Sequence, residues 1–202
     1  MVLGPGRYHG AMSLMFKGER VSLRTVERAD LPLFTQWFAD YDLMRLLHPG
    51  AVRLVNEDAE LEWFERMQND SRTWCFAIVV GAEQRLVGSC SLMNVEGKNR
   101  KATLGISIAD PAARGQGLGF EAMTLLLEFG FLELNLNRIQ LHVFGFNERA
   151  VKLYERLGFE REGILRQSVY REGRYWDEHI MSLLRSEYQP RAGWQLDQGV
   201  VP

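Results

Sequence analysis

The stretch Arg114-Gly115-Gln116-Gly117-Leu118-Gly119 lies at the boundary between two strongly patterned segments. Residues 101–109 alternate apolar and polar side chains as a strand does, and residues 120–134 carry apolar side chains at helical spacing. Three glycines at alternate positions leave the N–H groups of the turn uncovered by side chains, and the start of a helix adds the positive end of its dipole. The sequence therefore predicts a phosphate cradle between a strand and a helix.

Hydrophobic patterning elsewhere predicts a sheet with helices on both of its faces. Helices are expected over residues 30–38, 56–68, 120–134 and 147–157, and strands over 20–26, 74–80, 86–95, 101–109, 138–144, 159–170 and 174–184. Asp30 and Asn147 stand where helix N-caps are expected, and Gly158 stands where a helix ends. Because successive strands in mid-chain exclude a simple doubly wound fold, the expected class is α/β with a mixed, mostly antiparallel seven-stranded sheet.

The length of 202 residues suits one domain with a core of ordinary size. Residues 1–16 contain no apolar run of the kind that a secretory signal needs, so they are expected to form a flexible extension. The folded domain is expected over residues 17–188, and residues 189–202 are expected to form a loosely held tail.

Composition excludes several classes of function. The net charge of −2 gives no reason to expect a nucleic-acid or anionic-membrane partner. The longest apolar run is interrupted by Glu128 and Glu133, so no transmembrane helix is expected. Cys75 and Cys90 match no zinc spacing and are too few for a disulfide framework, so no metal is expected and the expected compartment is the cytoplasm.

Other nucleotide-binding patterns fit this glycine turn poorly. Residues 117–122 satisfy the G-x-G-x-x-A pattern of dinucleotide-binding proteins, but that pattern belongs to the first strand–helix unit of its fold. Here it follows antiparallel strands, and the next strand ends at Phe144 without an acidic residue that would hold a ribose. The G-K-[ST] of a P-loop is also absent. A nucleotide-dependent oxidoreductase is therefore the weaker hypothesis.

A second motif further along the chain completes a family resemblance. Arg114-x-x-Gly117-x-Gly119 resembles the [QR]-x-x-G-x-[GA] acetyl-CoA motif of the GCN5-related N-acetyltransferases (GNATs). Residues 147–159 resemble the N-x-x-A-x-x-L-Y-x-x-x-G-F motif of the same family. The second half of the chain looks most like the branches that act on ribosomal proteins and on polyamines. The resemblance covers residues 17–188 and implies the GNAT fold, in which two central strands splay apart.

The resemblance also implies an acyltransferase that moves an acetyl group from acetyl-CoA to a primary amine by direct transfer through a tetrahedral intermediate. The pyrophosphate would meet the N–H groups of residues 115–119, and Arg114 would add a charge-assisted contact. The pantetheine arm would lie between the splayed strands. The residues expected to bind acetyl-CoA are Ser107, Ile108, Ala109, Arg114, Gly115, Gln116, Gly117, Leu118, Gly119, Asn147 and Tyr154.

Tyr154 and Asn147 each have two interpretations. Beside the thioester sulfur, a phenol with an ordinary pKa of about 10 can protonate the departing thiolate, which makes Tyr154 the expected general acid. The alternative is that Tyr154 is an aromatic core residue beside Leu153 and Leu157. The amide of Asn147 either caps its helix or bonds the pantetheine arm.

The acceptor amine arrives as an ammonium and must lose a proton before it attacks. His142 is the first candidate base, because imidazole changes its charge near neutral pH. It stands where a related branch of the family carries a carboxylate, and its alternative role is structural. Glu96, acting through water, is the second candidate, whereas Thr103 cannot act as a base.

The resemblance implies an acceptor cleft between residues 37–48 and residues 170–178, where carboxylates and aromatic rings would attract a cation. These residues are Asp40, Tyr41, Asp42, Tyr170, Glu172, Tyr175, Trp176, Asp177 and Glu178. The sequence leaves open whether the acceptor is a protein N-terminal amine, a polyamine or another small amine. A catalytically silent acyl-CoA-binding module is the alternative function. The apolar strands would also allow a homodimer through edge pairing.

Overall fold

The computed structural model describes residues 14–52 and 55–190. The strands within these residues are β1 (Leu14–Lys17), β2 (Val21–Thr25), β3 (Trp74–Val80), β4 (Arg85–Glu96), β5 (Lys101–Ile108), β6 (Arg138–Phe144), β7 (Glu160–Arg171) and β8 (Arg174–Leu184). The helices are α1 (Leu31–Phe38), α2 (Tyr41–Leu47), α3 (Glu57–Asn69), α4 (Leu118–Glu128) and α5 (Glu148–Arg156). All seven expected strands are present, each with both ends within one residue of the prediction.

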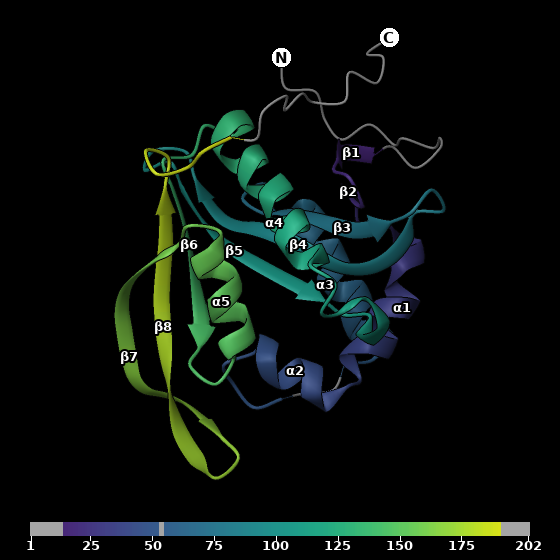
Figure 1. Cartoon of the computed structure of the whole chain (residues 1–202). Helices are drawn as coiled ribbons and strands as arrows, with labels where there is room; N and C mark the ends of the chain where they lie inside the picture. Colours follow the sequence, from purple (N-terminus) through teal and green to yellow (C-terminus); the bar gives the residue numbers. More distant parts are fainter. Residues whose placement is uncertain (1–13, 53–54, 191–202) are drawn as a thin grey trace.

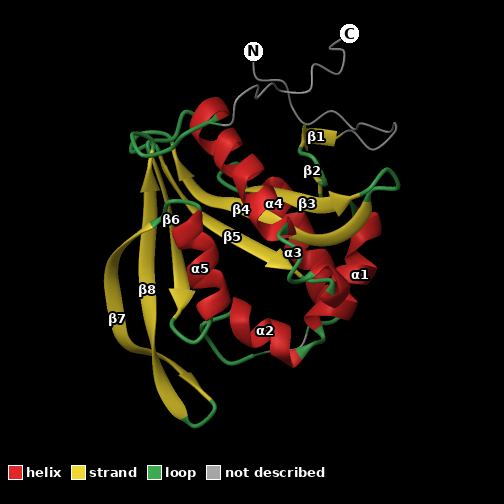
Figure 2. Cartoon of the chain, viewed as in Figure 1, coloured by secondary structure: helices red, strands yellow, loops and turns green. Residues whose placement is uncertain are grey.

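The strands form a single sheet in the order β1-β2-β3-β4-β5-β6-β8-β7 (Figure 1). Neighbouring strands are antiparallel except β5 and β6, which run parallel. Helices α4 and α5 cover one face, and α1 and α3 cover the other (Figure 2). The expected α/β class and the mixed, mostly antiparallel sheet are therefore confirmed.

Strand β3 shows why the sheet is buried on both faces. Phe76 and Ile78 belong to the core beneath α4, while Ala77 and Val79 belong to the smaller core beneath α1 and α3. Alternate side chains of a strand point to opposite faces, so a strand covered on both sides is apolar throughout. The sequence WCFAIVV of β3 follows this rule.

The sequence predicts seven strands, one fewer than the described residues form. Residues 14–17 pair with β2, and the buried ring of Phe16 contacts Phe76 and Phe129. The folded part of the chain therefore begins before residue 17, within the extension expected over residues 1–16. Residues 1–13 and 191–202 lie outside the described residues. Strand β1 has only four residues, which is too short for a period of two to stand out.

The helix expected over residues 120–134 has different ends. It begins at Leu118, directly after its N-cap Gly117, and changes at Phe129 into a π-helical turn that ends at Glu133. Gly130 lies in that turn, where an added Cβ would lie 2.7 Å from a methyl carbon of Ile139. Close packing against β6 accompanies the change of helix type. Hydrophobic spacing alone does not reveal where the helix changes type.

The prediction that the Asp30 side chain caps α1 is wrong. Its two carboxylate oxygens accept hydrogen bonds from Arg24, both at 2.7 Å, and one of them also accepts from the backbone N–H of Glu27 at 2.8 Å. Both side chains of this ion pair are buried. Asp30 therefore ties the start of α1 to β2 instead of satisfying the N–H groups of the helix.

Replacing Asp30 by Ala should lower the free energy of unfolding by about 3–5 kcal/mol, because it leaves the buried Arg24 cation without its partner. Urea unfolding measures the loss. The matched control is Glu155→Ala, which removes a solvent-exposed ion pair with Arg161 and should cost about 0–1 kcal/mol. Equal losses in the two variants would contradict this account of α1.

Candidate active site

Strands β5 and β6 pair only over their first three residues. The paired positions are Lys101 with Arg138, Ala102 with Ile139 and Thr103 with Gln140. Beyond them β5 continues along β4 and β6 continues along β8, so each strand keeps only its outer partner. The splay expected between two central strands is therefore present. Backbone groups that face the gap are free to bond an extended amide chain, as a sheet edge bonds an added strand.

A cleft of about 810 Å³ occupies this gap. The ends of β5 and β6, the glycine turn, α5 and α2 all contribute to its walls. Nine of the eleven residues expected to bind acetyl-CoA line the cleft, and Ala109 and Gln116 do not.

The glycine turn has the backbone conformation for which glycine is needed. Gly115 and Gly117 have φ of +81° and +80°, a region that side chains with a Cβ adopt at a cost. Gly117 is the N-cap of α4, so the first N–H groups of the helix have no intrahelical acceptor. These N–H groups and the helix dipole favour an anion at the mouth of the cleft.

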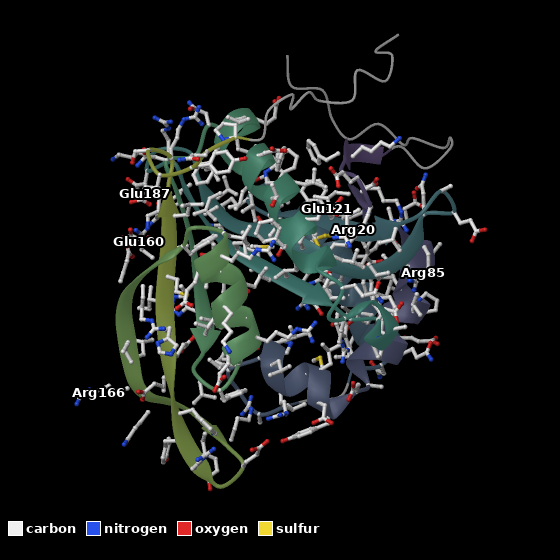
Figure 3. The ribbon with its side chains drawn as sticks, in the orientation of Figure 1. Arg20, Arg85, Glu121, Glu160, Arg166 and Glu187 are labelled. Carbon is white, nitrogen blue, oxygen red and sulfur yellow. The ribbon has the colours of Figure 1, made fainter. Side chains whose placement is uncertain are left out.

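Arg114 and Gln116 stabilise the turn itself. The Arg114 guanidinium donates to the carbonyl oxygens of Ile108 at 3.0 Å and Ala109 at 2.7 Å. The Gln116 amide donates to the carbonyl of Ala112 at 2.6 Å. From the other side Arg20 donates to the Gln116 carbonyl at 2.9 Å and pairs with Glu121, and Figure 3 shows these two charged side chains together. The turn is thus held by its own side chains before any ligand binds.

Three cationic residues that sequence reasoning missed line the cleft from α5. Arg149, Lys152 and Arg156 are spaced so that they share one helix face. The Arg149 guanidinium lies 3.6 Å from the position that a Cβ would take at Gly115, and the Arg156 guanidinium lies 4.1 Å from the ring centre of Phe120. The helical spacing of these three basic residues is visible in the sequence and could have identified them. The three side chains add positive charge beside the glycine turn.

Tyr154 combines the two interpretations offered for it. Its side chain is buried in the core beneath α4, beside Phe159, and it also lines the cleft. Burial raises the pKa of the phenol to about 12. Because that pKa lies well above neutral pH, the hydroxyl keeps its proton and can donate it.

Asn147 also fulfils part of both interpretations. Its side-chain oxygen accepts from the backbone N–H of Ala150 at 3.2 Å, which caps α5, and the residue lines the cleft. The amide nitrogen is the end of the side chain that suits a ligand carbonyl.

His142 is joined to a carboxylate. Its Nδ1 lies 3.2 Å from Oε1 of the buried Glu178, whose Oε2 accepts from the hydroxyl of Ser168 at 2.8 Å. The imidazole is 42% exposed, and both His142 and Glu178 line the cleft. Ile139, Leu141 and Val143 belong to the core beneath α4 and α5, so His142 projects from the opposite face of the sheet.

The structure contradicts Glu96 as a second candidate base. Glu96 pairs with Lys101 at the start of β5, whereas the cleft extends to the end of that strand, and Glu96 does not line it. Hydrogen bonds from Asn99 at 2.6 Å and from Lys101 lower the pKa of its carboxyl. A lowered pKa makes a carboxylate a weaker base.

The expected acidic acceptor wall is also wrong in most of its residues. Asp40 caps α2, Glu172 pairs with Arg45 at 2.6 Å, and Asp177 accepts from the backbone N–H of Gln167. Asp42 is 84% exposed. Of the nine residues expected to form this wall, only Glu178 lines the cleft, and α2 contributes apolar side chains instead. Tyr41, Tyr170 and Tyr175 are exposed, and Trp176 packs on Arg174 and Phe146.

Within the described residues, no group of three or more His, Cys, Asp or Glu side chains is placed to hold a metal ion. Likewise, none of the described helices is long and apolar enough to cross a membrane.

The fold thus brings together a sheet split by a cleft, a glycine turn suited to an anion and a histidine–carboxylate pair. The sequence model of the acetyltransferase (GNAT) domain matches residues 20–160. Spermidine N(1)-acetyltransferase from Vibrio cholerae is 31% identical over 173 residues, which cover 86% of this chain and 98% of the relative. The uncharacterized N-acetyltransferase p20 from Bacillus licheniformis is 28% identical over 171 residues, covering 84% and 96%.

A solved structure agrees with these sequence matches. The spermidine N-acetyltransferase from Vibrio cholerae in complex with CoA and spermine has a TM-score of 0.75 and 30% identity, over 83% of this chain and 96% of that one. The chain belongs to the GNAT acetyltransferase family. It is an acetyl-CoA-dependent N-acetyltransferase.

Replacing Arg149 by Ala should raise the KM for acetyl-CoA about 10-fold and leave kcat within about 2-fold, because a charge-assisted contact to phosphate stabilises donor binding more than the reaction step. Initial rates at varied acetyl-CoA measure both constants. The matched control is Arg166→Ala, since Figure 3 shows Arg166 on the outer side of β7. An unchanged KM in the Arg149 variant would remove Arg149 from the donor site.

Proposed function

We propose that this protein transfers the acetyl group of acetyl-CoA directly to a small primary amine, with Tyr154 as the general acid and His142 as the general base. One observation carries the proposal. Tyr154 lies on the α4–α5 side of the sheet and His142 projects from the other side, yet both line the same cleft where β5 and β6 separate. A donor that enters from the first side and an amine that enters from the second would meet between these two groups.

The donor side is suited to acetyl-CoA. The N–H groups after Gly117 and the cations of Arg149 and Lys152 would neutralise the pyrophosphate. The inner edges of β5 and β6, beyond Thr103 and Gln140, would bond the amides of the pantetheine arm. This arrangement would direct the thioester into the gap, beside Tyr154.

The acceptor side supplies the base. With Nδ1–H donating to Glu178, the Nε2 of His142 is the nitrogen left to accept a proton. The ammonium gives one proton to His142, and the neutral amine then attacks the thioester carbon. The carboxylate of Glu178 balances the positive charge that the imidazole gains. Glu178 and Ser168 also fix the orientation of the ring.

The reaction ends when the carbon–sulfur bond breaks. The departing thiolate takes a proton from the Tyr154 hydroxyl, and the resulting phenolate is reprotonated from solvent or from the product. A phenol whose pKa burial raises to about 12 keeps its proton at neutral pH, so the hydroxyl can donate to the sulfur as the carbon–sulfur bond breaks. The spermidine acetyltransferases among the relatives support a small amine as the acceptor.

Tyr154→Phe should lower kcat about 100-fold and leave the Kd for CoA within about 2-fold, because it removes the proton donor and keeps the ring. Tyr170→Phe, at the exposed tip of the β7–β8 hairpin, is the control and should retain full activity. In the wild-type enzyme, a pKa of about 12 places loss of the Tyr154 proton above pH ~10, so no descending limb from this group is expected below that pH. Full activity in Tyr154→Phe would exclude the acid role.

His142→Ala should lower kcat/KM about 100-fold and should abolish the rise of kcat/KM with pH that a deprotonating base produces. The pH–rate profile is the decisive readout, because a merely structural histidine would change the rate without changing the shape of the profile. His48→Ala is the control, since His48 bonds through its backbone: its N–H donates to the Met44 carbonyl and its carbonyl accepts from Arg171. A variant of His142 with the wild-type profile would exclude this base.

A further inference from the structure

We infer that the acceptor is a monoamine with an apolar substituent and that polyamines are poor substrates. This inference rests on the proposed function and names the substrate class of the same site. It departs from the activity for which the similar spermidine acetyltransferases are named.

The part of the cleft wall that α2 and the residues after it contribute is apolar. Leu46 and Leu47 of α2 are partly buried, and they line the cleft together with Leu43 and Pro49. Arg45, on the same helix, is directed instead to the β7–β8 hairpin, where it pairs with Glu172. Helix α2 therefore turns its aliphatic side chains toward the substrate and its charged ones away from it. An alkyl or aromatic substituent would bury apolar surface here, whereas a second ammonium would lose its water without gaining a partner.

The cleft offers one carboxylate to a cation. Among the described residues that line it, Glu178 is the only Asp or Glu. Its two oxygens already receive His142 and Ser168, so it can balance one positive charge at the reacting nitrogen. A polyamine would need further carboxylates along the alkyl chain. Asp40, Glu172 and Asp177 are each held by another partner, as described above.

The apolar wall is fixed in place by the hairpin. The buried Arg171 donates to the carbonyl oxygens of His48 at 2.6 Å and Gly50 at 2.5 Å, directly after α2. The Arg45–Glu172 ion pair makes a second link between α2 and the hairpin. These two links hold Leu46 and Leu47 toward the cleft. A rotation of α2 that turned Asp42 toward the cleft in their place would break both links.

The sharpest test compares two amines of equal length. n-Heptylamine and 1,6-diaminohexane have the same number of heavy atoms and differ in one terminal group, a methyl in the first and an ammonium in the second. We expect kcat/KM for n-heptylamine to exceed that for 1,6-diaminohexane at least 10-fold, and spermidine to be poorer still. In Leu46→Glu the preference should reverse, because the new carboxylate can pair with the second ammonium. Leu33→Glu adds the same charge on α1, outside the cleft, and should leave the preference unchanged.

Binding separates this inference from the proposed function. Calorimetric titration of the full chain saturated with CoA should show the same order of affinity for the two amines, whether or not either is acetylated. Tighter binding of n-heptylamine without any N-acetyl product would contradict the proposed function but would still support the inference about the acceptor. Binding or turnover of 1,6-diaminohexane equal to that of n-heptylamine would overturn the inference. A 10-fold preference for the tripeptide amide Ser-Gly-Gly over n-heptylamine would also overturn it.

Discussion

The separation of β5 from β6 after Thr103 and Gln140 is the constraint on which the rest of the site depends. Buried backbone groups must be bonded, so two strands can part only where each is held firmly on its other side. Strand β4 approaches β5 so closely at Gly88 that a Cβ there would lie 2.0 Å from the carbonyl oxygen of Ser107. At the far ends, Asp110 N–H donates to Val87 and Gly145 N–H donates to Asp177, which extends the outer pairings past the gap. The unpaired inner edges are thereby fixed as two walls for a ligand.

The gap divides the chemistry between the two faces of the sheet. On the α4–α5 face lie the groups that suit an anionic donor, namely the glycine turn, the cations of α5 and a buried phenol that keeps its proton. On the opposite face lies His142, paired with Glu178, and α2 lines the same cleft with aliphatic side chains. In the proposed function, a long anionic donor and a small cationic acceptor would enter from opposite sides of the sheet and meet at the gap.

Features encoded by neighbouring residues could be predicted from the sequence, and features that depend on distant partners could not. The strands, the glycine turn and the Asn147 cap follow from local patterning, and two spaced motifs led to Tyr154. The Arg24–Asp30 ion pair, the role of Arg114 in holding its own turn and the pairing of His142 with Glu178 join residues from different elements. The prediction of an acidic acceptor wall was wrong for the same reason. The expected carboxylates are bonded elsewhere, and α2 lines the cleft with leucines. The stripe of Arg149, Lys152 and Arg156 was visible at helical spacing and was overlooked.

A crystal structure of the complex with acetyl-CoA tests the central claim most directly. We expect the pantetheine arm to lie between β5 and β6, with its amides bonded to the inner strand edges and its sulfur within about 3.5 Å of the Tyr154 hydroxyl. A donor bound outside the gap, or a thioester sulfur on the far side of the cleft from Tyr154, would contradict it.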